Sequence, residues 1–455
     1  MSESLQTPIL APGVKDFMLD PKFWIKQKNN LDKPIINEKR KKNFIEESYK
    51  RASSKNLKWD FCNIEEYPST ISKGTLFKMM EDYSDPEKFK NTDYYNIHGE
   101  LVSKKSKEEI IELTGFDYIP DKIRVRFGLI IKRVDVRAFP SDEVFAKKPE
   151  TIDQDMFQLT ALSVGTPVAI LHMSKNSSWC FVQASRYRGW VKSEYIAPAR
   201  KRGDLYKYLD KKEKLVVIDS RIETEPNPFK PKISNIGFQM GDDIPLVDDS
   251  EIPESIPSDN LQAQSPEGCY VISLPVKDKE GYLKILPALI ARSQGVNEGY
   301  LSYTRKNLIK QSFKLLGERY GWGGLFNRRD CSRFIMDIYR SVGLQIPRDA
   351  GQPQEKIPPG KVIEFRGTVR ERKEKLKMLD PGDPIYMKGH VVMYLGDYNG
   401  DYYVIHAGSG YGKKEAKDKI QPITVHGVFV MKVDQYMKSG EKKYIEAFKL
   451  ARKFG

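Results

Sequence analysis

Residues 329–340 read RDCSRFIMDIYR, a stretch that sets the local structure around a lone cysteine. Apolar side chains within it and just after it recur at helical spacing: Phe334, Ile335, Ile338 and Val342. Gly343 is a typical helix stop, so Cys331 lies in the first turn of the predicted helix. Unpaired backbone N–H groups and the helix dipole favour a thiolate there, so we expect a lowered pKa for the thiol. A cysteine with a purely structural role lies more often in the middle of such a helix.

Two of the five histidines fall on one predicted hairpin downstream of the cysteine. His390 opens the apolar run HVVMYLG, His406 ends the next run, and Asn399-Gly400 is a typical two-residue turn between them. Adjacent antiparallel strands can place the two imidazoles side by side. One imidazole can then deprotonate the cysteine while the other holds it in the required tautomer. Two histidines without a catalytic role are the alternative, and a metal site is less favoured because no third ligand stands at suitable spacing.

The surrounding region, residues 296–455, changes from helical to strand patterns. Thr304 is a suitable N-cap for a helix whose apolar face we expect to comprise four side chains: Ile309, Phe313, Leu316 and Tyr320. Strand-like runs follow from residue 383 onward. Helices followed by strands predict an α+β domain.

The part of the chain before residue 296 divides into three predicted segments. Residues 122–200 contain many short alternating, aromatic-rich runs, which predict a small β-barrel. Residues 201–295 are also β-rich, and we predict a second, degenerate barrel there. Residues 1–121 are mostly helical in pattern and carry no catalytic constellation, so we predict a packing or docking domain.

The amino-acid composition limits the kinds of molecule that this protein is expected to bind. The chain has 455 residues, and 76 Lys+Arg against 62 Asp+Glu give a net charge of +14, which favours anionic partners. Lys and Arg form no long block interleaved with aromatic residues, so we expect no nucleic-acid partner. Four scattered cysteines make neither a disulfide framework nor a paired-cysteine zinc site.

Nothing in the sequence indicates an integral membrane segment, because no run of about 18 uncharged apolar residues occurs. The N-terminus lacks a basic region followed by an apolar one. Two expectations follow: a cytosolic protein, or an envelope protein (periplasmic or secreted) from which a signal peptide was removed.

The motifs of the C-terminal region together resemble the NlpC/P60 family of cysteine peptidases. In chain order they are Arg319-Tyr320-Gly321-Trp322-Gly323-Gly324, Asp330-Cys331-Ser332, Asp380-Pro381-Gly382-Asp383, Gly389-His390-Val391, Tyr394-Leu395-Gly396 and His406-Ala407. The middle region resembles a bacterial SH3 domain through Gly165-Thr166-Pro167-Val168, Trp179 and Tyr187-Arg188-Gly189-Trp190-Val191. The resemblance implies a multi-domain fold: a papain-like α+β catalytic domain over 296–455, two SH3-like barrels over 122–200 and 201–295, and a mostly helical stabilising domain over 1–121.

The resemblance also implies an activity. Members of this kind cleave the γ-D-glutamyl–diamino acid bond of peptidoglycan stem peptides and need no metal or organic cofactor. Carried onto this chain, Cys331 is the nucleophile, His390 the general base, His406 the orienting member and Tyr320 an oxyanion donor. We expect a monomer whose partners are stem peptides of the L-Ala-γ-D-Glu-diamino acid type.

The resemblance assigns the substrate contacts as well. Asp330 and Ser332 match residues that hold the D-Glu part, and Arg348 and Asp349 border the cleft. In the first SH3-like segment, Tyr187 and Asp155 are candidates for the free amine of the substrate's L-Ala. A polar role in an ordinary loop is the alternative for both.

One residue departs from the family pattern: Arg333 stands where the family usually has Gly. It either narrows and charges the groove or points to solvent. A different function class also stays open, namely a cell-wall-binding SH3 scaffold with a non-catalytic papain-like core. The intact set of Cys331, His390 and His406 favours the enzyme, because a pseudo-enzyme would be free to lose it.

Overall fold

The computed structural model describes residues 9–151, 153–252, 264–415 and 419–454. Its internal contacts divide the chain into two compact units. Unit 1 comprises Met1–Arg51, Leu301–Tyr320 and Arg328–Gly455, and unit 2 comprises Ala52–Tyr300 and Gly321–Asn327. The chain therefore passes from unit 1 into unit 2 after Tyr320 and returns shortly before the cysteine. In the part of the chain that the structure describes, we find no helix with the length and apolar character that crossing a membrane requires.

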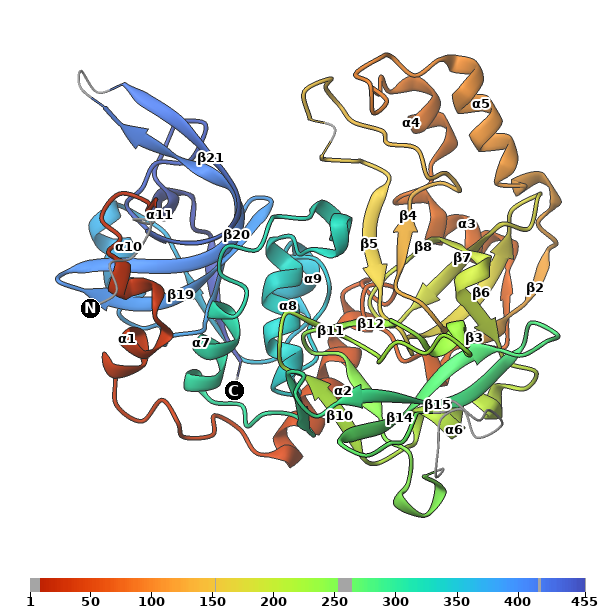
Figure 1. The fold of residues 1–455 in the computed structure, drawn as a ribbon. Coiled ribbons are helices and arrows are strands. Elements are labelled where there is room, and N and C mark those ends of the chain that lie inside the picture. Colours follow the sequence, from red (N-terminus) through yellow and green to blue (C-terminus); the bar gives the residue numbers. More distant parts are fainter. Residues whose placement is uncertain (1–8, 152, 253–263, 416–418, 455) are drawn as a thin grey trace. The chain divides into compact units, whose positions relative to one another are not determined.

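Unit 1 is built on a six-stranded antiparallel sheet with the strand order β17-β22-β18-β19-β20-β21. The strands are β17 (Lys361–Glu364), β18 (Pro384–Met387), β19 (His390–Tyr398), β20 (Asp401–Lys414), β21 (Ile420–Lys432) and β22 (Leu450–Lys453). The helices are α1 (Pro21–Lys26), α2 (Glu38–Ser54), α7 (Arg305–Phe313), α8 (Cys331–Ser341), α9 (Gln352–Lys356), α10 (Val369–Leu376) and α11 (Tyr444–Ala447), with a 3-10 turn η1 (Asp16–Leu19). Helix α8 packs against β19 and β20 (Figure 1). This α+β arrangement agrees with the predicted fold class.

Residues 9–51 pack within unit 1. Trp24 of α1 is fully buried, with its ring 5.3 Å from that of Tyr403 on β20. Phe44 of α2 lies 5.9 Å, ring to ring, from Phe454. The predicted helical region is present, and its residues are shared between the two units. The domain limits at residues 121, 200 and 295 stay predictions.

The helix expected after Thr304 is confirmed as α7. The Thr304 hydroxyl oxygen accepts the backbone N–H of Asn307 at 3.1 Å, which caps the helix. The helix ends at Phe313, so Leu316 and Tyr320 lie beyond it and the predicted apolar face is too long.

Unit 2 contains a seven-stranded antiparallel sheet with the order β5-β4-β8-β7-β6-β3-β9. The strands are β3 (Arg126–Ile130), β4 (Val134–Arg137), β5 (Gln158–Leu162), β6 (Pro167–Met173), β7 (Trp179–Ala184), β8 (Arg188–Lys192) and β9 (Ile196–Pro198). Trp190 and Phe181 are fully buried in its core, as expected for alternating strands. The short strands predicted between residues 122 and 200 are therefore present.

The helices of unit 2 are α3 (Lys73–Glu81), α4 (Pro86–Asn91), α5 (Lys104–Leu113) and α6 (Tyr206–Leu209). Short 3-10 segments are η2 (Ile64–Glu66), η3 (Phe116–Tyr118), η4 (Ser193–Tyr195), η5 (Arg202–Leu205), η6 (Pro231–Ile233) and η7 (Asp249–Glu251). The segment η8 (Trp322–Asn327) is interrupted by a kink, because residues 323–326 have non-helical backbone angles. Strands β1 (Thr70–Ser72) and β2 (Lys122–Arg124) pair with each other.

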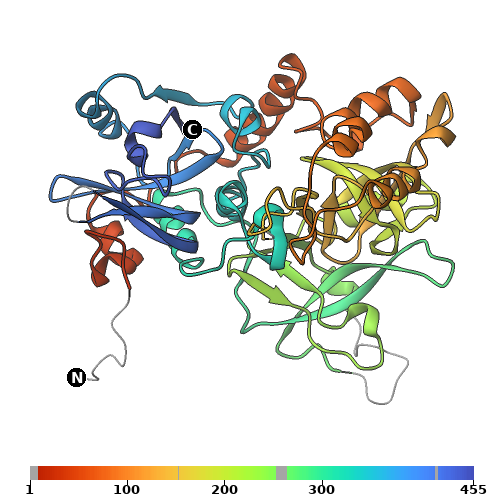
Figure 2. The ribbon, with the colours of Figure 1, turned by 90° about the horizontal axis from the view of Figure 1, so that it is seen from above.

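The second β-rich segment consists of three small sheets with the orders β13-β10-β16, β11-β12 and β14-β15. Their strands are β10 (Lys214–Val217), β11 (Arg221–Glu223), β12 (Gly237–Gln239), β13 (Asp243–Pro245), β14 (Cys269–Lys277), β15 (Leu283–Ala291) and β16 (Val296–Glu298). The β14–β15 ribbon is the longest pairing here and is drawn in green in Figure 2. The strands share one apolar core that includes Leu215, Phe238 and Ile272.

Candidate active site

Helix α8 begins at Cys331, as the sequence predicts. Asp330 caps it, because the Asp330 carboxylate accepts the backbone N–H of Arg333 at 2.8 Å. The helix ends before Gly343, whose φ of +79° is the left-handed conformation typical of a helix stop. The first turn of a well-capped helix therefore carries the cysteine.

The Cys331 side chain is buried and interacts with three hydrogen-bonding groups. Backbone N–H groups of Ser332 and Val391 reach its sulfur, and the Tyr320 hydroxyl shares a hydrogen bond with it. Val391 directly follows His390 at the start of β19. The contact with Val391 therefore brings the first residues of β19 beside the thiol.

The expected lowering of the thiol pKa is wrong. Burial raises the pKa of the Cys331 thiol to about 12, and the nearby Asp330 carboxylate raises it further. Hydrogen bonds from Val391 and Ser332 act in the opposite direction but do not outweigh burial. The position at a helix start was visible in the sequence, whereas the loss of solvent depends on the packing of the whole unit.

The two histidines lie side by side, as the hairpin prediction requires. His390 Nε2 is 2.8 Å from His406 Nδ1, a hydrogen-bonding distance. The connecting turn is Asn399-Gly400, with φ of +52° and +81°, the values of a type I′ hairpin. The structure thus joins the two imidazoles through one nitrogen of each ring.

His406 is fully buried in an apolar surrounding. Its ring centre lies 4.5 Å from that of Phe429 on β21 and 5.6 Å from that of Tyr444 on α11. Gly408 leaves room for the ring, because a Cβ there would lie 2.7 Å from the Cε1 atom of His406. Among the described residues, no group hydrogen-bonds the other ring nitrogen, Nε2.

These contacts determine which protons the pair carries if His390 acts as a base. To accept the thiol proton at Nδ1, His390 must hold its own proton at Nε2 and donate it to His406 Nδ1. His406 then carries its proton at Nε2. His406 therefore serves as an acceptor that fixes the tautomer and orientation of His390.

Burial also keeps both rings neutral. Burial lowers the pKa of His390 to about 4, although the nearby Asp330 charge opposes this shift. It lowers the pKa of His406 well below the ordinary value, and His390 adds to the effect. At neutral pH the site therefore holds a protonated thiol beside a neutral imidazole, so proton transfer accompanies the attack of the sulfur.

A second polar network surrounds the cysteine. Arg348 donates to one oxygen of Asp330 at 3.0 Å and to the other at a short distance, and it donates to the Ser332 hydroxyl at 2.6 Å. Burial alone would raise the pKa of Asp330, but the charge and hydrogen bonds of Arg348 hold it below its ordinary value. Asp349 is more exposed, with its carboxylate 4.0 Å from Arg348. The structure thus gathers all four predicted residues of this set within unit 1.

Of the two expectations for Arg333, the structure contradicts the solvent-exposed one. It is 4% exposed, and its Nε lies 2.7 Å from a carboxylate oxygen of the fully buried Asp337. Asp337 stands one helical turn further along α8, so the buried guanidinium has a counter-charge on the same helix. Arg333 therefore does not point to solvent, and its charge is matched inside the unit.

Asp155 and Tyr187, the candidates for the substrate's amine, lie in unit 2. The Asp155 carboxylate accepts the backbone N–H groups of Phe145 at 3.1 Å and Phe157 at 2.9 Å, and it pairs with Arg137. The Tyr187 ring is 7% exposed and packs 5.3 Å from the ring of Tyr83. Both side chains are engaged inside unit 2, and their substrate role stays a prediction.

Comparison with known proteins identifies two domain types in this chain. Residues 317–423 match the model of the NlpC/P60 family, and residues 144–192 match that of an SH3 domain of the SH3b1 type. The chain contains an NlpC/P60 domain. Both domain types agree with the resemblance inferred from the motifs.

Individual relatives match the chain to different extents. A γ-D-glutamyl-L-lysine dipeptidyl-peptidase from Bacillus cereus is 32% identical over 148 residues, which is 30% of this chain and 36% of that protein. The solved structure of an NlpC/P60 endopeptidase from Photobacterium damselae subsp. piscicida has the same fold, with a TM-score of 0.69 at 18% identity over 90% of both chains. An NlpC/P60 family structure from Bacillus cereus aligns with a TM-score of 0.45 at 18% identity, over 72% of this chain and 99% of that one. The chain thus matches only about a third of the length of the curated relative.

Sequence reasoning missed two residues that shape the NlpC/P60 site. Tyr444 lies against both imidazoles, with its ring 5.6 Å from His406 and 6.4 Å from His390. Tyr444 lies far from both histidines in the sequence, so no local pattern indicated that it would contact them. Gly408 could have been predicted from the alternation of the strand, because it follows His406 by two residues and so lies on the same strand face.

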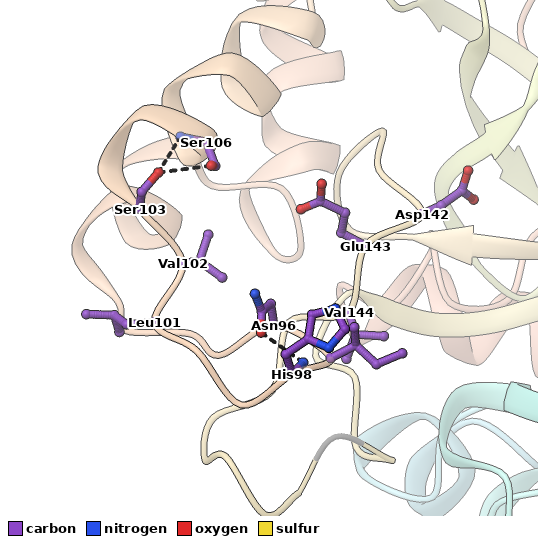
Figure 3. Close-up of a pocket in the computed structure, with 10 residues that line it drawn as sticks. Asn96, His98, Leu101, Val102, Ser103, Ser106, Asp142, Glu143 and Val144 are labelled. Atoms are coloured by element: carbon purple, nitrogen blue, oxygen red, sulfur yellow. Dashed lines mark hydrogen bonds between the residues drawn. The ribbon is translucent and has the colours of Figure 1, made fainter.

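A separate cavity of about 500 Å³ lies within unit 2. Figure 3 shows the segment from Asn96 to Ser106 on one side of it and the loop from Asp142 to Val144 on the other. Several of its polar groups already bond one another: Ser103 caps α5 by accepting the Ser106 N–H, and Asn96 accepts the His98 N–H. It includes none of the residues of the Cys-His-His cluster.

Proposed function

We propose that this protein is a cysteine endopeptidase that hydrolyses the γ-D-glutamyl–diamino acid bond of peptidoglycan stem peptides. The observation that carries the proposal is the 2.8 Å contact between His390 and His406 at the start of the strand whose Val391 N–H reaches the Cys331 sulfur. The NlpC/P60 match and the name of the Bacillus cereus relative support the substrate class.

The acylation step follows from these contacts. The Cys331 sulfur attacks the γ-carbonyl carbon of D-Glu while its proton passes to His390 Nδ1, and His406 stabilises the resulting imidazolium. The Tyr320 hydroxyl and backbone N–H groups at the start of α8 stabilise the oxyanion. The C–N bond then breaks, and His390 returns the proton to the departing amine of the diamino acid.

Deacylation runs through the same residues. The D-glutamyl carbonyl is now a thioester of Cys331, and a water molecule attacks it as His390 takes a proton from that water. Collapse of the tetrahedral intermediate breaks the C–S bond and returns the proton to the sulfur. The product with a free γ-carboxyl group is released and the Cys331 thiol is regenerated, without a metal or organic cofactor.

We assign the D-glutamyl part of the substrate to the Asp330, Ser332 and Arg348 network. All three side chains are buried and bonded to one another beside the nucleophile. Arg348 balances the Asp330 charge, so the network presents a rigid and nearly neutral polar wall. A rigid wall of this kind suits the positioning of a carbonyl for attack.

Product analysis tests the proposal. The protein is incubated with L-Ala-γ-D-Glu-meso-diaminopimelate and with L-Ala-γ-D-Glu-L-Lys, and products are identified by mass spectrometry. We expect release of the free diamino acid and L-Ala-D-Glu from at least one tripeptide. Cys331→Ala should lower the rate by at least about a thousandfold, whereas Cys269→Ser, at a half-buried cysteine of unit 2, should not.

Two results would contradict the assignment. Cleavage by folded Cys331→Ala protein at a near-normal rate would reject the assignment of Cys331 as the nucleophile. Binding of peptidoglycan without cleavage of either tripeptide would favour the wall-binding scaffold instead.

We further propose that the L-Ala amine must be free. If Asp155 and Tyr187 bind it, acetylation removes its charge and adds bulk, and we expect a loss in rate of about a hundredfold. Because Asp155 already pairs with Arg137, the amine would have to share that carboxylate. Comparing free and N-acetylated tripeptide checks this, and equal rates would reject the requirement.

A further inference from the structure

Arg329, two residues before the nucleophile, is 1% exposed and holds two carboxylates. Its Nη1 lies 2.9 Å from each oxygen of Glu318, and its Nε lies 2.9 Å from Asp337. Glu318 precedes Tyr320 by two residues, and Asp337 lies within α8. One guanidinium therefore joins the segment that carries Tyr320 to the helix that carries Cys331.

The backbone repeats the same connection. Tyr320 and Arg329 form a parallel β-bridge, and the Tyr320 N–H donates to the carbonyl oxygen of His426 at 2.8 Å. Glu318 is tied to the same strand, because its carbonyl oxygen accepts the Val428 N–H at 2.9 Å. The side-chain bridge through Arg329 extends this connection to Asp337 in the interior of α8.

The charges around Arg329 make this bridge rigid. Besides Arg329, the fully buried Asp337 has Arg333 at 2.7 Å and Arg340 at 3.8 Å. Buried ion pairs of this kind add little net stability compared with apolar packing, but breaking one leaves an uncompensated charge. Their geometry is therefore tightly held, and any shift of Glu318 relative to α8 is opposed.

We propose that Arg329 is a positioning residue that holds the Tyr320 hydroxyl against the Cys331 sulfur through Glu318 and Asp337. The inference deepens the proposed function and rests on it for the role of Tyr320 in the reaction. The hydrogen bond between Tyr320 and Cys331 itself belongs to the resting site. Arg329 does not touch the reacting atoms, so its effect passes through that contact.

The test measures Cys331 reactivity without any substrate. Iodoacetamide labelling of the Cys331 peptide is followed by mass spectrometry between pH 6 and pH 10 in the wild type, Tyr320→Phe, Arg329→Met and the double variant. Loss of one hydrogen bond to a thiolate slows labelling about tenfold. We expect each single variant to show this loss and the double variant to be no slower than either.

Two further variants separate positioning from stability. Arg305→Met removes another buried guanidinium of unit 1, which pairs with Asp383, and should label at the wild-type rate. Glu318→Gln keeps the shape of the side chain and loses one charge, so it serves if Arg329→Met does not fold. Folding of each variant is checked by near-ultraviolet circular dichroism.

Two outcomes would overturn the inference. Folded Arg329→Met, or Glu318→Gln in its place, that labels like the wild type would show that the bridge does not act on the thiol. Losses that multiply in the double variant, to about a hundredfold, would show that Arg329 and Tyr320 act independently. Because labelling needs no peptide substrate, failure of the wild type to cleave muropeptides would reject the proposed function and leave this result intact.

Discussion

At the scale of single residues, His406 contributes one acceptor atom. Only its Nδ1 contacts His390, and its other nitrogen has no hydrogen-bond partner among the described residues. A side chain that offers an acceptor at the same place should therefore preserve much of the function. This reasoning separates orientation of the base from direct participation in proton transfer.

We expect His406→Gln to lower kcat about tenfold and His406→Ala about a hundredfold, because the alanine variant loses the bond to a charged imidazolium. Steady-state kinetics on the tripeptide measures both. An equal and complete loss in the two variants would indicate that His406 itself carries a proton in the reaction.

Burial of the two reacting groups predicts the pH dependence. The pKa of His390 is lowered to about 4 and that of Cys331 raised to about 12, so the base stays neutral and the thiol protonated between these values. We expect kcat/KM to rise through about pH 4 and then stay flat to about pH 9. An alkaline fall near pH 8 would instead indicate a resting thiolate–imidazolium pair.

The same depressed pKa has a consequence for stability. Unfolded His390 titrates near its ordinary value of 6.5 and folded His390 near 4, so the unfolded state binds more protons between these values. The free energy of unfolding should therefore rise with pH across that window, and His390→Ala should flatten the slope. Urea unfolding at several pH values measures it.

At the scale of elements, the N-caps of α7 and α8 differ in the other contacts that they make. Thr304 caps α7 with a neutral hydroxyl, whereas Asp330 caps α8 and also balances the buried Arg348. Thr304→Ala should cost about 1 kcal/mol. Asp330→Ala should cost about 3–5 kcal/mol, because it also removes the carboxylate that accepts hydrogen bonds from the buried Arg348 guanidinium.

Urea denaturation of both variants, with circular dichroism as readout, checks this difference. Asp330→Asn keeps a capping oxygen and removes only the charge, so it isolates the contribution of Arg348. Equal losses for Thr304→Ala and Asp330→Ala would show that the Arg348 contact contributes no stability.

Element boundaries followed local signals where those signals were sufficient. The start of α8, the cap of α7 and the Asn399-Gly400 turn were all predictable, because capping side chains and turn residues act within a few positions. The end of α7 was not. Leu316 continues the helical spacing, yet the helix stops at Phe313 and the chain turns toward the sheet.

At the scale of the whole molecule, the segment between Tyr320 and Cys331 belongs partly to unit 2. There Gln158 on β5 donates to the Gly323 carbonyl at 3.0 Å, and Arg133 donates to that of Gly324 at 3.2 Å. Gly323 has a φ of +55°, and a Cβ on it would lie 2.4 Å from the Gln158 carbonyl oxygen. The loop that precedes the nucleophile in the chain is therefore held within unit 2 by hydrogen bonds from Gln158 and Arg133.

Gly323→Ala should displace this loop, because it combines a left-handed backbone conformation with a contact to rigid backbone. We expect kcat/KM to fall at least about tenfold. Gly203→Ala is the matched control in unit 2, since a Cβ there meets nothing within 4 Å. Unchanged kinetics in folded Gly323→Ala protein would show that the loop does not influence catalysis.

The sequence by itself determined which residues could do chemistry and on which local elements they stand. Cys331 at a helix start and two histidines on one hairpin follow from capping, turn and alternation patterns, which depend on near neighbours. The tertiary structure decided what surrounds them. Burial raises the pKa of the Cys331 thiol where a lowering was expected. Ion pairs engage Asp155 with Arg137 and connect Glu318 through Arg329 to Asp337, residues that are not neighbours in the sequence. Desolvation and long-range pairing have no local sequence signal, so only the folded chain reveals them.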